Sequence, residues 1–334
     1  MKPTIKDIAK KIDVSVATVS RVINNRSGYS PETEKKVLKA INKLGYYPNA
    51  LARGLVGKKI KTIGVLMPSV SSMVASKILN GIEDAAHNKN YSVIICNTDN
   101  SGKRTINYLR VLREKQIDGI IVVSEILTDK YINVIKKMEA RVVLVSTIAK
   151  GNNFTYIKVD DVTAAYQTTE YLINKGHKNI AMISGTKDDV VAGIPRVKGY
   201  LKALEDYGLP KKKENLVYGD FSFDSGKICM EKLLKQSSKI TAVFAASDEM
   251  AIGALSTAYK QRINVPEQLS VIGYDNTKLA QMVVPPLTVL SQPFYQMGYE
   301  GLSMLISKIE GENVESKILP HIIIERQTVK DINR

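Results

Sequence analysis

The sequence predicts an α/β protein with a small N-terminal helix-turn-helix head and a body of two doubly wound parallel-sheet subdomains. Three observations support this expectation. The first 48 residues carry apolar side chains at helical spacing. From residue 61 onward, short runs rich in Val and Ile alternate with amphipathic stretches, as in parallel strands joined by helices. The chain has 334 residues, enough for about two domains.

The head (residues 1–48) begins with two short helices. Thr4 and Ser15 are their expected N-caps. The apolar faces are Ile5, Ile8, Ala9 and Ile12 in the first helix and Val19, Val22 and Ile23 in the second. Two helices joined by so short a turn form a helix-turn-helix. A third helix is expected to start at Ser30-Pro31 and to end at Gly45.

The outward face of the second helix carries groups that suit DNA. Val16 and Ala17 can meet a thymine methyl group, and Arg21 can fork onto a guanine. Polar candidates for phosphate contacts are Thr4, Ser15, Thr18, Ser20 and Asn24. Taken alone, this face is equally consistent with the ordinary surface of a small helical bundle.

Positive charge is concentrated at the same end of the chain. Residues 1–60 hold thirteen Lys and Arg and four Asp and Glu, a net charge of +9 out of +15 for the whole protein. A solvated basic face would explain this distribution, and so would a head that binds a polyanion.

Residues 49–60 are predicted to form a hinge. Asn49 can cap a helix of about seven residues that contains Gly54, and so short a helix is unstable alone in water. We therefore expect residues 46–57 to be mobile without DNA and helical with it. The candidate DNA contacts of the hinge are Asn49, Ala52 and Leu55.

The body (residues 61–334) contains more apolar runs than one compact sheet holds, which predicts two subdomains. The expected strands are residues 62–67, 92–96, 119–123, 142–145, 180–183, 242–246 and 269–273. Two late strands, around residues 287–291 and 318–324, are expected to cross back between the halves. The expected N-subdomain is about 61–160 with 292–320, and the C-subdomain is about 161–291 with 321–334. Polar residues after the strands predict a cleft for a hydroxyl-rich small molecule.

Composition and motifs exclude other classes. Hydrophobic residues make up 44% and charged residues 24%, as in a globular protein. No apolar run could span a membrane, no secretory signal is evident, and the two cysteines match no disulfide framework, so we expect a cytoplasmic protein. Phosphate-binding loops and metal-ligand spacings are absent, and the pairs Asp160-Asp161 and Asp188-Asp189 suit caps or loops. We expect no enzyme, no cofactor and no metal.

The chain resembles the LacI/GalR family of bacterial repressors. The resemblance rests on residues 4–9, 14–24 and 45–50, and it extends to about Thr328. It implies a homodimer with a periplasmic-binding-protein-like core that represses genes of carbohydrate metabolism. It also implies that the second helix enters the major groove of a palindromic operator and that Leu55 acts as a wedge in the minor groove.

The resemblance also implies a set of residues that bind a small sugar or sugar-phosphate effector. Arg196 and Asp275 match the polar pair of the family's cleft, and Phe221 and Phe294 match its aromatic positions. The family's pattern is altered at Met73, Ser146 and Ser247, which stand at other cleft positions. A structural ion pair between Arg196 and Asp275 is the alternative to a ligand role.

Within the family, the chain is most similar to the catabolite control branch, for example over residues 48–55, 115–121 and 275–277. That branch uses a serine-phosphorylated phosphocarrier protein as corepressor, on a helix that matches residues 295–308. Gln296 and Ser303 stand where the branch places an acid and an arginine, so a cation for the phosphoserine is missing. We therefore expect a sugar-responsive repressor, with the carrier-dependent global regulator as the alternative. A second, less favoured alternative is a sugar-metabolising enzyme fused to the head.

Overall fold

The computed structural model describes residues 3–24, 26–46, 60–98, 103–138, 140–149, 154–236 and 239–333. The chain divides into two compact units, Met1–Ile60 and Lys61–Arg334. Among the helices in the described ranges, none combines the length and the apolar character that a membrane crossing requires.

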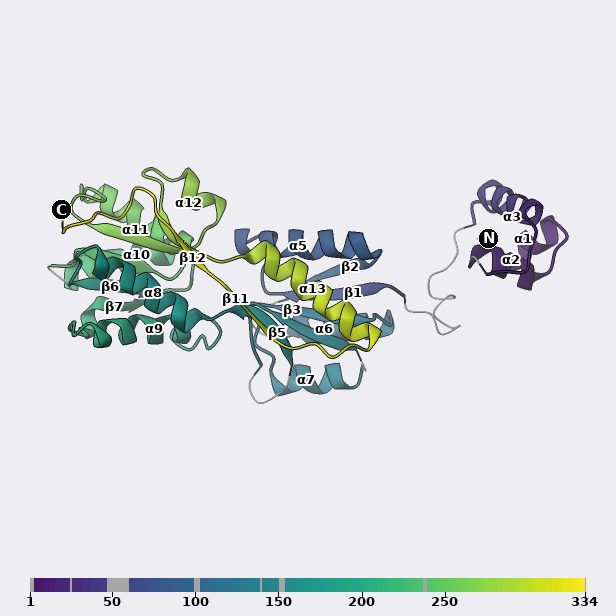
Figure 1. The fold of residues 1–334 in the computed structure, drawn as a ribbon, viewed down its shortest axis with the longest axis horizontal. Helices are drawn as coiled ribbons and strands as arrows, with labels where there is room; N and C mark the ends of the chain where they lie inside the picture. The colour runs from purple at the N-terminus through teal and green to yellow at the C-terminus, as the bar shows by residue number, and fades with distance from the viewer. Residues whose placement is uncertain are drawn as a thin grey trace. The chain divides into compact units, whose positions relative to one another are not determined.

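In its described residues, 3–24, 26–46 and 60, the first unit contains three helices around a small core (Figure 1). They are α1 (Ile5–Lys11), α2 (Val16–Ile23) and α3 (Pro31–Leu44). Ile8, Val19 and Val37 are fully buried, one from each helix. Ser30 caps α3, Pro31 is its first residue, and Gly45 ends it with a left-handed backbone. The predicted helical faces and caps of α2 and α3 are therefore confirmed.

The described residues of the second unit form two six-stranded sheets. In the first sheet the order is β11-β5-β4-β3-β1-β2, and in the second it is β12-β10-β9-β8-β6-β7. The strands of the first sheet are β1 (Thr62–Met67), β2 (Ser92–Asn97), β3 (Gly119–Val123), β4 (Arg141–Val145), β5 (Thr155–Val159) and β11 (Lys317–Leu319). Those of the second sheet are β6 (Ile180–Ser184), β7 (Leu216–Tyr218), β8 (Ala242–Ala245), β9 (Ser270–Asp275), β10 (Thr288–Ser291) and β12 (Ile322–Ile324). Pairing is parallel throughout, except between β10 and β12.

Helices cover both faces of each sheet, as the doubly wound architecture requires (Figure 1). The first sheet has α5 (Met73–Lys89) and α13 (Phe294–Glu310) on one face and α6 (Lys103–Glu114) and α7 (Asp129–Lys136) on the other. The second sheet is flanked by two packed helix pairs, α8 (Asp161–Asn174) with α9 (Gly193–Asp206) and α10 (Phe223–Gln236) with α11 (Asp248–Lys260). A short helix, α12 (Lys278–Met282), follows β9. The predicted α/β fold class is confirmed.

Three elements differ from the sequence expectation. β5 and β7 were not expected, because β5 mixes polar and apolar residues and β7 has only three residues. The expected single strand at 318–324 is two strands separated by Pro320 and His321. β11 pairs with β5 in the first sheet, and β12 pairs with β10 in the second, so this segment does cross between the sheets.

Candidate functional site

Helix α2 presents the predicted recognition face to solvent. The Ser15 hydroxyl accepts a hydrogen bond from the Thr18 backbone N–H at 3.0 Å, so Ser15 is the N-cap. Val19 and Val22 are buried, which turns Val16, Ala17 and Arg21 outward. Val16 is 42% exposed, so its apolar side chain is available for contacts outside the head. An exposed apolar group beside an arginine suits the edges of base pairs.

The polar candidates of the head already have partners within the chain. The Thr4 hydroxyl and backbone N–H both donate to the Asp7 carboxylate at 2.7 Å. The Asn24 side chain donates to the Ser20 carbonyl at 2.7 Å. These bonds fix the start of α1 and the end of α2. A hydroxyl group has one donor and two acceptor sites, so the serine and threonine hydroxyls can contact phosphate in addition to their internal partners. Asn49, Ala52 and Leu55 lie outside the described residues, so the hinge contacts remain predictions.

Replacing Ser15 by alanine should destabilise the head by about 1 kcal/mol, because the Thr18 N–H loses its acceptor. Ser30→Ala is the matched control, since Ser30 caps α3 in the same way through Thr33. Thermal unfolding of the two variants should show similar losses. Only Ser15→Ala should weaken operator binding further at temperatures where both heads are folded. Equal operator affinity of the two variants would exclude a DNA contact by Ser15.

The body contains a cavity of about 270 Å³ at the carboxyl ends of strands from both sheets. All seven predicted effector residues line it. From the first subdomain these are Met73, Ser146 and Phe294, and from the second they are Arg196, Phe221, Ser247 and Asp275. Ser146 follows β4, Ser247 follows β8 as the N-cap of α11, and Asp275 ends β9. The parallel sheets thus bring together residues that lie up to about 220 positions apart in the sequence.

Arg196 is held from behind by a network of buried groups. Its Nε donates to Asp161 Oδ1 at 3.0 Å, and its Nη1 donates to the Ala246 carbonyl at 2.6 Å. The guanidinium carbon lies 3.9 Å from the centre of the Tyr274 ring. Burial disfavours the charged form, but the combined effect of Asp161, Tyr274 and Asp275, together with the hydrogen bond to Asp161, outweighs it and raises the pKa of Arg196 above its usual value. The guanidinium is therefore a fixed, permanent positive charge at the cavity wall.

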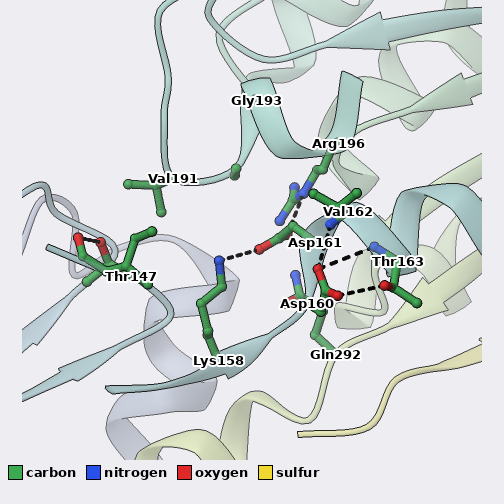
Figure 2. Close-up of polar contacts among 12 residues, drawn as sticks. Thr147, Lys158, Asp160, Asp161, Val162, Thr163, Val191, Gly193, Arg196 and Gln292 are labelled. Atoms are coloured by element: carbon green, nitrogen blue, oxygen red, sulfur yellow. Dashed lines mark hydrogen bonds and ion pairs between the residues drawn. The ribbon is translucent and has the colours of Figure 1, made fainter. Parts of the chain in front are cut away.

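The ion-pair partner of Arg196 is Asp161, as Figure 2 shows, and not Asp275. Within the described part of the chain, no ion pair joins Arg196 to Asp275, so the structural alternative stated above is wrong. Asp160 is the N-cap of α8, as expected for one member of the Asp160-Asp161 pair. Asp161 is not a cap, because its carboxylate is buried against Arg196 and Lys158.

Two carboxyl groups of the cavity have strongly shifted pKa values. Burial raises the pKa of Asp275 to about 8, with the charge of Arg196 opposing this shift and the charge of Asp248 adding to it. Burial also raises the pKa of Asp248 to about 6, against hydrogen bonds from Thr277. The Gln292 side-chain amide donates to Asp275 Oδ1 at 2.8 Å. In the free protein, Asp275 is therefore mostly neutral at pH 7.

This shift predicts a pH dependence of stability. The unfolded chain loses the Asp275 proton near pH 4, whereas the folded chain keeps it to about pH 8. The stabilising contribution of this carboxyl is thus complete below pH 4 and is lost progressively as the pH rises toward 8. Asp275→Asn should remove this loss, so that its free energy of unfolding rises relative to wild type from pH 5 to 8. Parallel pH profiles in urea denaturation would contradict the shift.

Phe221 forms an apolar part of the cavity wall. Its ring packs on Gly185, where a Cβ atom would lie 1.9 Å from the ring. The ring centre is 5.9 Å from the Arg196 guanidinium carbon, and the Phe221 carbonyl accepts a hydrogen bond from Ser247. A hydroxyl-rich ligand with one apolar face can use such a combination of ring and polar groups.

Sequence reasoning did not assign every cavity residue. The additional lining residues are Ser72, Val74, Ser124, Asp189, Val191, Ala192, Asp248, Glu249, Thr277 and Gln292. Asp248 directly follows the assigned Ser247, Thr277 is two positions after the assigned Asp275, and Ser124 follows a predicted strand. Proximity in sequence was therefore the signal that could have identified them. Asp189 accepts hydrogen bonds from three successive backbone N–H groups of residues 191–193, the expected capping role. Over the described ranges, no cluster of three or more His, Cys, Asp or Glu side chains could hold a metal ion.

Two family descriptions match the chain and together span most of it. "Bacterial regulatory proteins, lacI family" matches residues 4–49. "Periplasmic binding proteins and sugar binding domain of LacI family" matches residues 60–327. The first match contains helices α1, α2 and α3, and the second contains both sheets and the residues that line the cavity.

Individual regulators are also similar to this chain over nearly its full length. The chain is 41% identical to Catabolite control protein A of Priestia megaterium, over 99% of this chain and 100% of that protein. The structure of the lac repressor dimer bound to operator and the anti-inducer ONPF has a TM-score of 0.89 at 27% identity, covering 99% of this chain and 100% of the other. A complex of the transcriptional regulator CelR with cellobiose has a TM-score of 0.75 at 30% identity, covering 98% and 99%.

Proposed function

Because the chain belongs to the LacI family of bacterial regulatory proteins, we propose that it is a repressor that binds a palindromic operator as a homodimer and responds to a sugar-like effector in the cavity. It is a DNA-binding transcriptional regulator, not an enzyme. The observation that carries the effector part of the proposal is the convergence of all seven predicted residues on one cavity. Its volume, about 270 Å³, is near the lower end for small-molecule sites.

The charges at the cavity favour a neutral sugar over a sugar phosphate. Among the lining residues that the structure describes, Arg196 is the one lysine or arginine, against the acids Asp189, Asp248, Glu249 and Asp275. Arg196 also donates hydrogen bonds to Asp161 and to the Ala246 carbonyl, which leaves fewer of its N–H groups for a ligand. A phosphate group needs several strong donors or cations. The cellobiose complex of the related regulator CelR is consistent with a neutral ligand.

Domain roles follow from this proposal. Residues 1–48 read the operator, residues 49–60 form the hinge, and residues 61–334 bind the effector and form the dimer. A dimer presents two copies of α2, and a two-fold symmetric operator matches that arrangement. The resemblance of Ala17 and Arg21 to the catabolite control branch favours an operator with a central CG step.

Calorimetric titration of the full-length protein with a panel of neutral sugars and their phosphates tests the effector proposal. We expect at least one neutral sugar to bind, with a lower affinity for its phosphate, and nuclear magnetic resonance should recover the sugar unchanged. Turnover of a sugar would favour the enzyme alternative. Tighter binding of the phosphate would contradict the charge argument.

The carrier-dependent alternative is favoured by the 41% identity to Catabolite control protein A. On α13, however, Gln296 donates to Glu300 at 2.7 Å and the Ser303 hydroxyl donates to the Tyr299 carbonyl at 2.8 Å. Neither residue supplies a cation for a phosphoserine. We therefore expect a serine-phosphorylated phosphocarrier protein to leave operator affinity unchanged. A stimulation of more than about tenfold by that protein, absent with its unphosphorylated form, would establish the alternative.

A further inference from the structure

Three short segments carry the chain between the two sheets in the described part of the body. They join β5 to α8, β10 to α13 and β11 to β12. A polar side-chain contact lies at each of them: Lys158 with Asp161, Gln292 with Asp275, and His321 with Gln167. The first two contacts lead directly to the polar groups of the cavity, because Asp161 holds Arg196 and Asp275 lines the wall.

The contact between Lys158 and Asp161 spans the first of these segments. Lys158 is in β5, whose backbone is paired on both sides within the first sheet. Asp161 is the first residue of α8, which packs on the second sheet. Lys158 Nζ lies 3.0 Å from Asp161 Oδ2, and both side chains are buried. A rotation of one subdomain against the other about residues 159–160 would change this distance.

The second oxygen of the same carboxylate fixes the arginine at the cavity. Asp161 Oδ1 accepts from Arg196 Nε at 3.0 Å and from the Tyr274 hydroxyl at 3.2 Å. Asp161 itself does not line the cavity, and neither does Lys158. Figure 2 shows the resulting chain of contacts, from Lys158 through Asp161 to Arg196.

We infer that Asp161 is a positioning residue that holds Arg196 toward the effector and, through Lys158, ties the position of Arg196 to the angle between the two subdomains. This inference deepens the proposed function, since it rests on the cavity being the effector site. When a ligand binds Arg196, the contacts through Asp161 and Lys158 transmit the change to residues 159–160, where the relative orientation of the subdomains is set.

The charge balance of the network makes the inference testable without unfolding the protein. Asp161 lies between two cations, so Lys158→Met leaves its carboxylate paired with Arg196 and creates no buried charge without a partner. Lys158→Arg preserves the cation and serves as the rescue variant. Lys175→Met is the matched control, because Lys175 forms an ion pair of 2.9 Å with Glu325 within the second subdomain.

Distances between the subdomains can be measured by pulsed electron paramagnetic resonance on the full-length protein. Spin labels would be placed at Lys136→Cys in α7 and Lys198→Cys in α9, after replacing Cys96 and Cys229 by serine and diluting with unlabelled protein. We expect one narrow distance for wild type, Lys158→Arg and Lys175→Met, and a broadened or shifted distribution for Lys158→Met. Identical distributions for wild type and Lys158→Met would overturn the link to the subdomain angle.

The positioning of Arg196 has its own readout, the nuclear magnetic resonance signal of its Nε–H group. Asp161→Asn should shift or broaden this signal, whereas Lys158→Met should leave it near the wild-type position. An unchanged signal in folded Asp161→Asn would overturn the positioning role. Both measurements use no ligand and no DNA. Their failure is therefore distinguishable from a failure of sugar binding, which would refute the proposed function instead.

Discussion

Asp275→Ala is expected to abolish the effector response while leaving the fold and the basal operator affinity intact. The carboxyl lines the cavity, and the Gln292 amide at 2.8 Å holds it in place. Loss of one or two hydrogen bonds to a ligand amounts to roughly 2–3 kcal/mol, or about 30- to 150-fold in effector affinity. Removing a group that burial keeps mostly neutral at pH 7 leaves no unpaired charge behind.

Operator binding by fluorescence anisotropy, with and without the sugar found by calorimetry, measures this effect. Asp224→Ala is the control, since Asp224 is an exposed acid on α10 that pairs with Lys227. Regulation retained in Asp275→Ala would move the effector site elsewhere in the protein. Loss of the fold would assign the carboxyl a purely structural role.

Arg21→Ala should weaken operator binding by about 1–3 kcal/mol and relax discrimination at one base pair in each half-site. Arg21 is exposed on α2 and lies over Gly28, where a Cβ atom would be 3.4 Å from the guanidinium. No buried contact of the head is lost on truncation, so the change should act on DNA binding alone.

Lys39→Ala, at an exposed lysine of α3, is the matched control for the loss of one positive charge. It should affect specific and random DNA alike, with a small change in salt dependence. Binding of both variants to the operator, to single-base variants of it and to random DNA separates the two kinds of contact. If Arg21→Ala weakens random DNA and operator equally, its role as a base-reading residue is wrong.

The fold could be predicted wherever strands are buried on both faces. Strands β1 and β3 match the expected residues 62–67 and 119–123. Their residues are buried on both faces of the sheet, and a short run without charged residues indicates such a strand. Strand β5 was missed because Thr155, Tyr156 and Lys158 interrupt the apolar pattern, although Lys158 is buried against Asp161. The Thr155 hydroxyl donates to the carbonyl of Val314, which lies 159 positions away, and no local pattern contains such a contact.

The cavity was predicted more completely than its supporting network. Ser146, Ser247 and Asp275 follow from their places at strand ends, which parallel sheets bring to a common edge. Asp161 could not be assigned, because its partner Arg196 is 35 residues away and the adjacent Asp160 is an ordinary helix cap. The alternative pairing of Arg196 with Asp275 is wrong because Asp161, which no sequence motif marks, is the acid that contacts the guanidinium.

The central claim is that one chain joins an operator-reading head to a sugar-binding cavity. The most direct test is the affinity of the full-length protein for a DNA site selected from a random library, measured by anisotropy as the panel of neutral sugars is added. We expect a two-fold symmetric site, bound at least about a thousandfold more tightly than random DNA, and at least one sugar that changes this affinity. A protein that binds a sugar in the cavity but enriches no symmetric site, or whose operator affinity that sugar leaves unchanged, would contradict the claim.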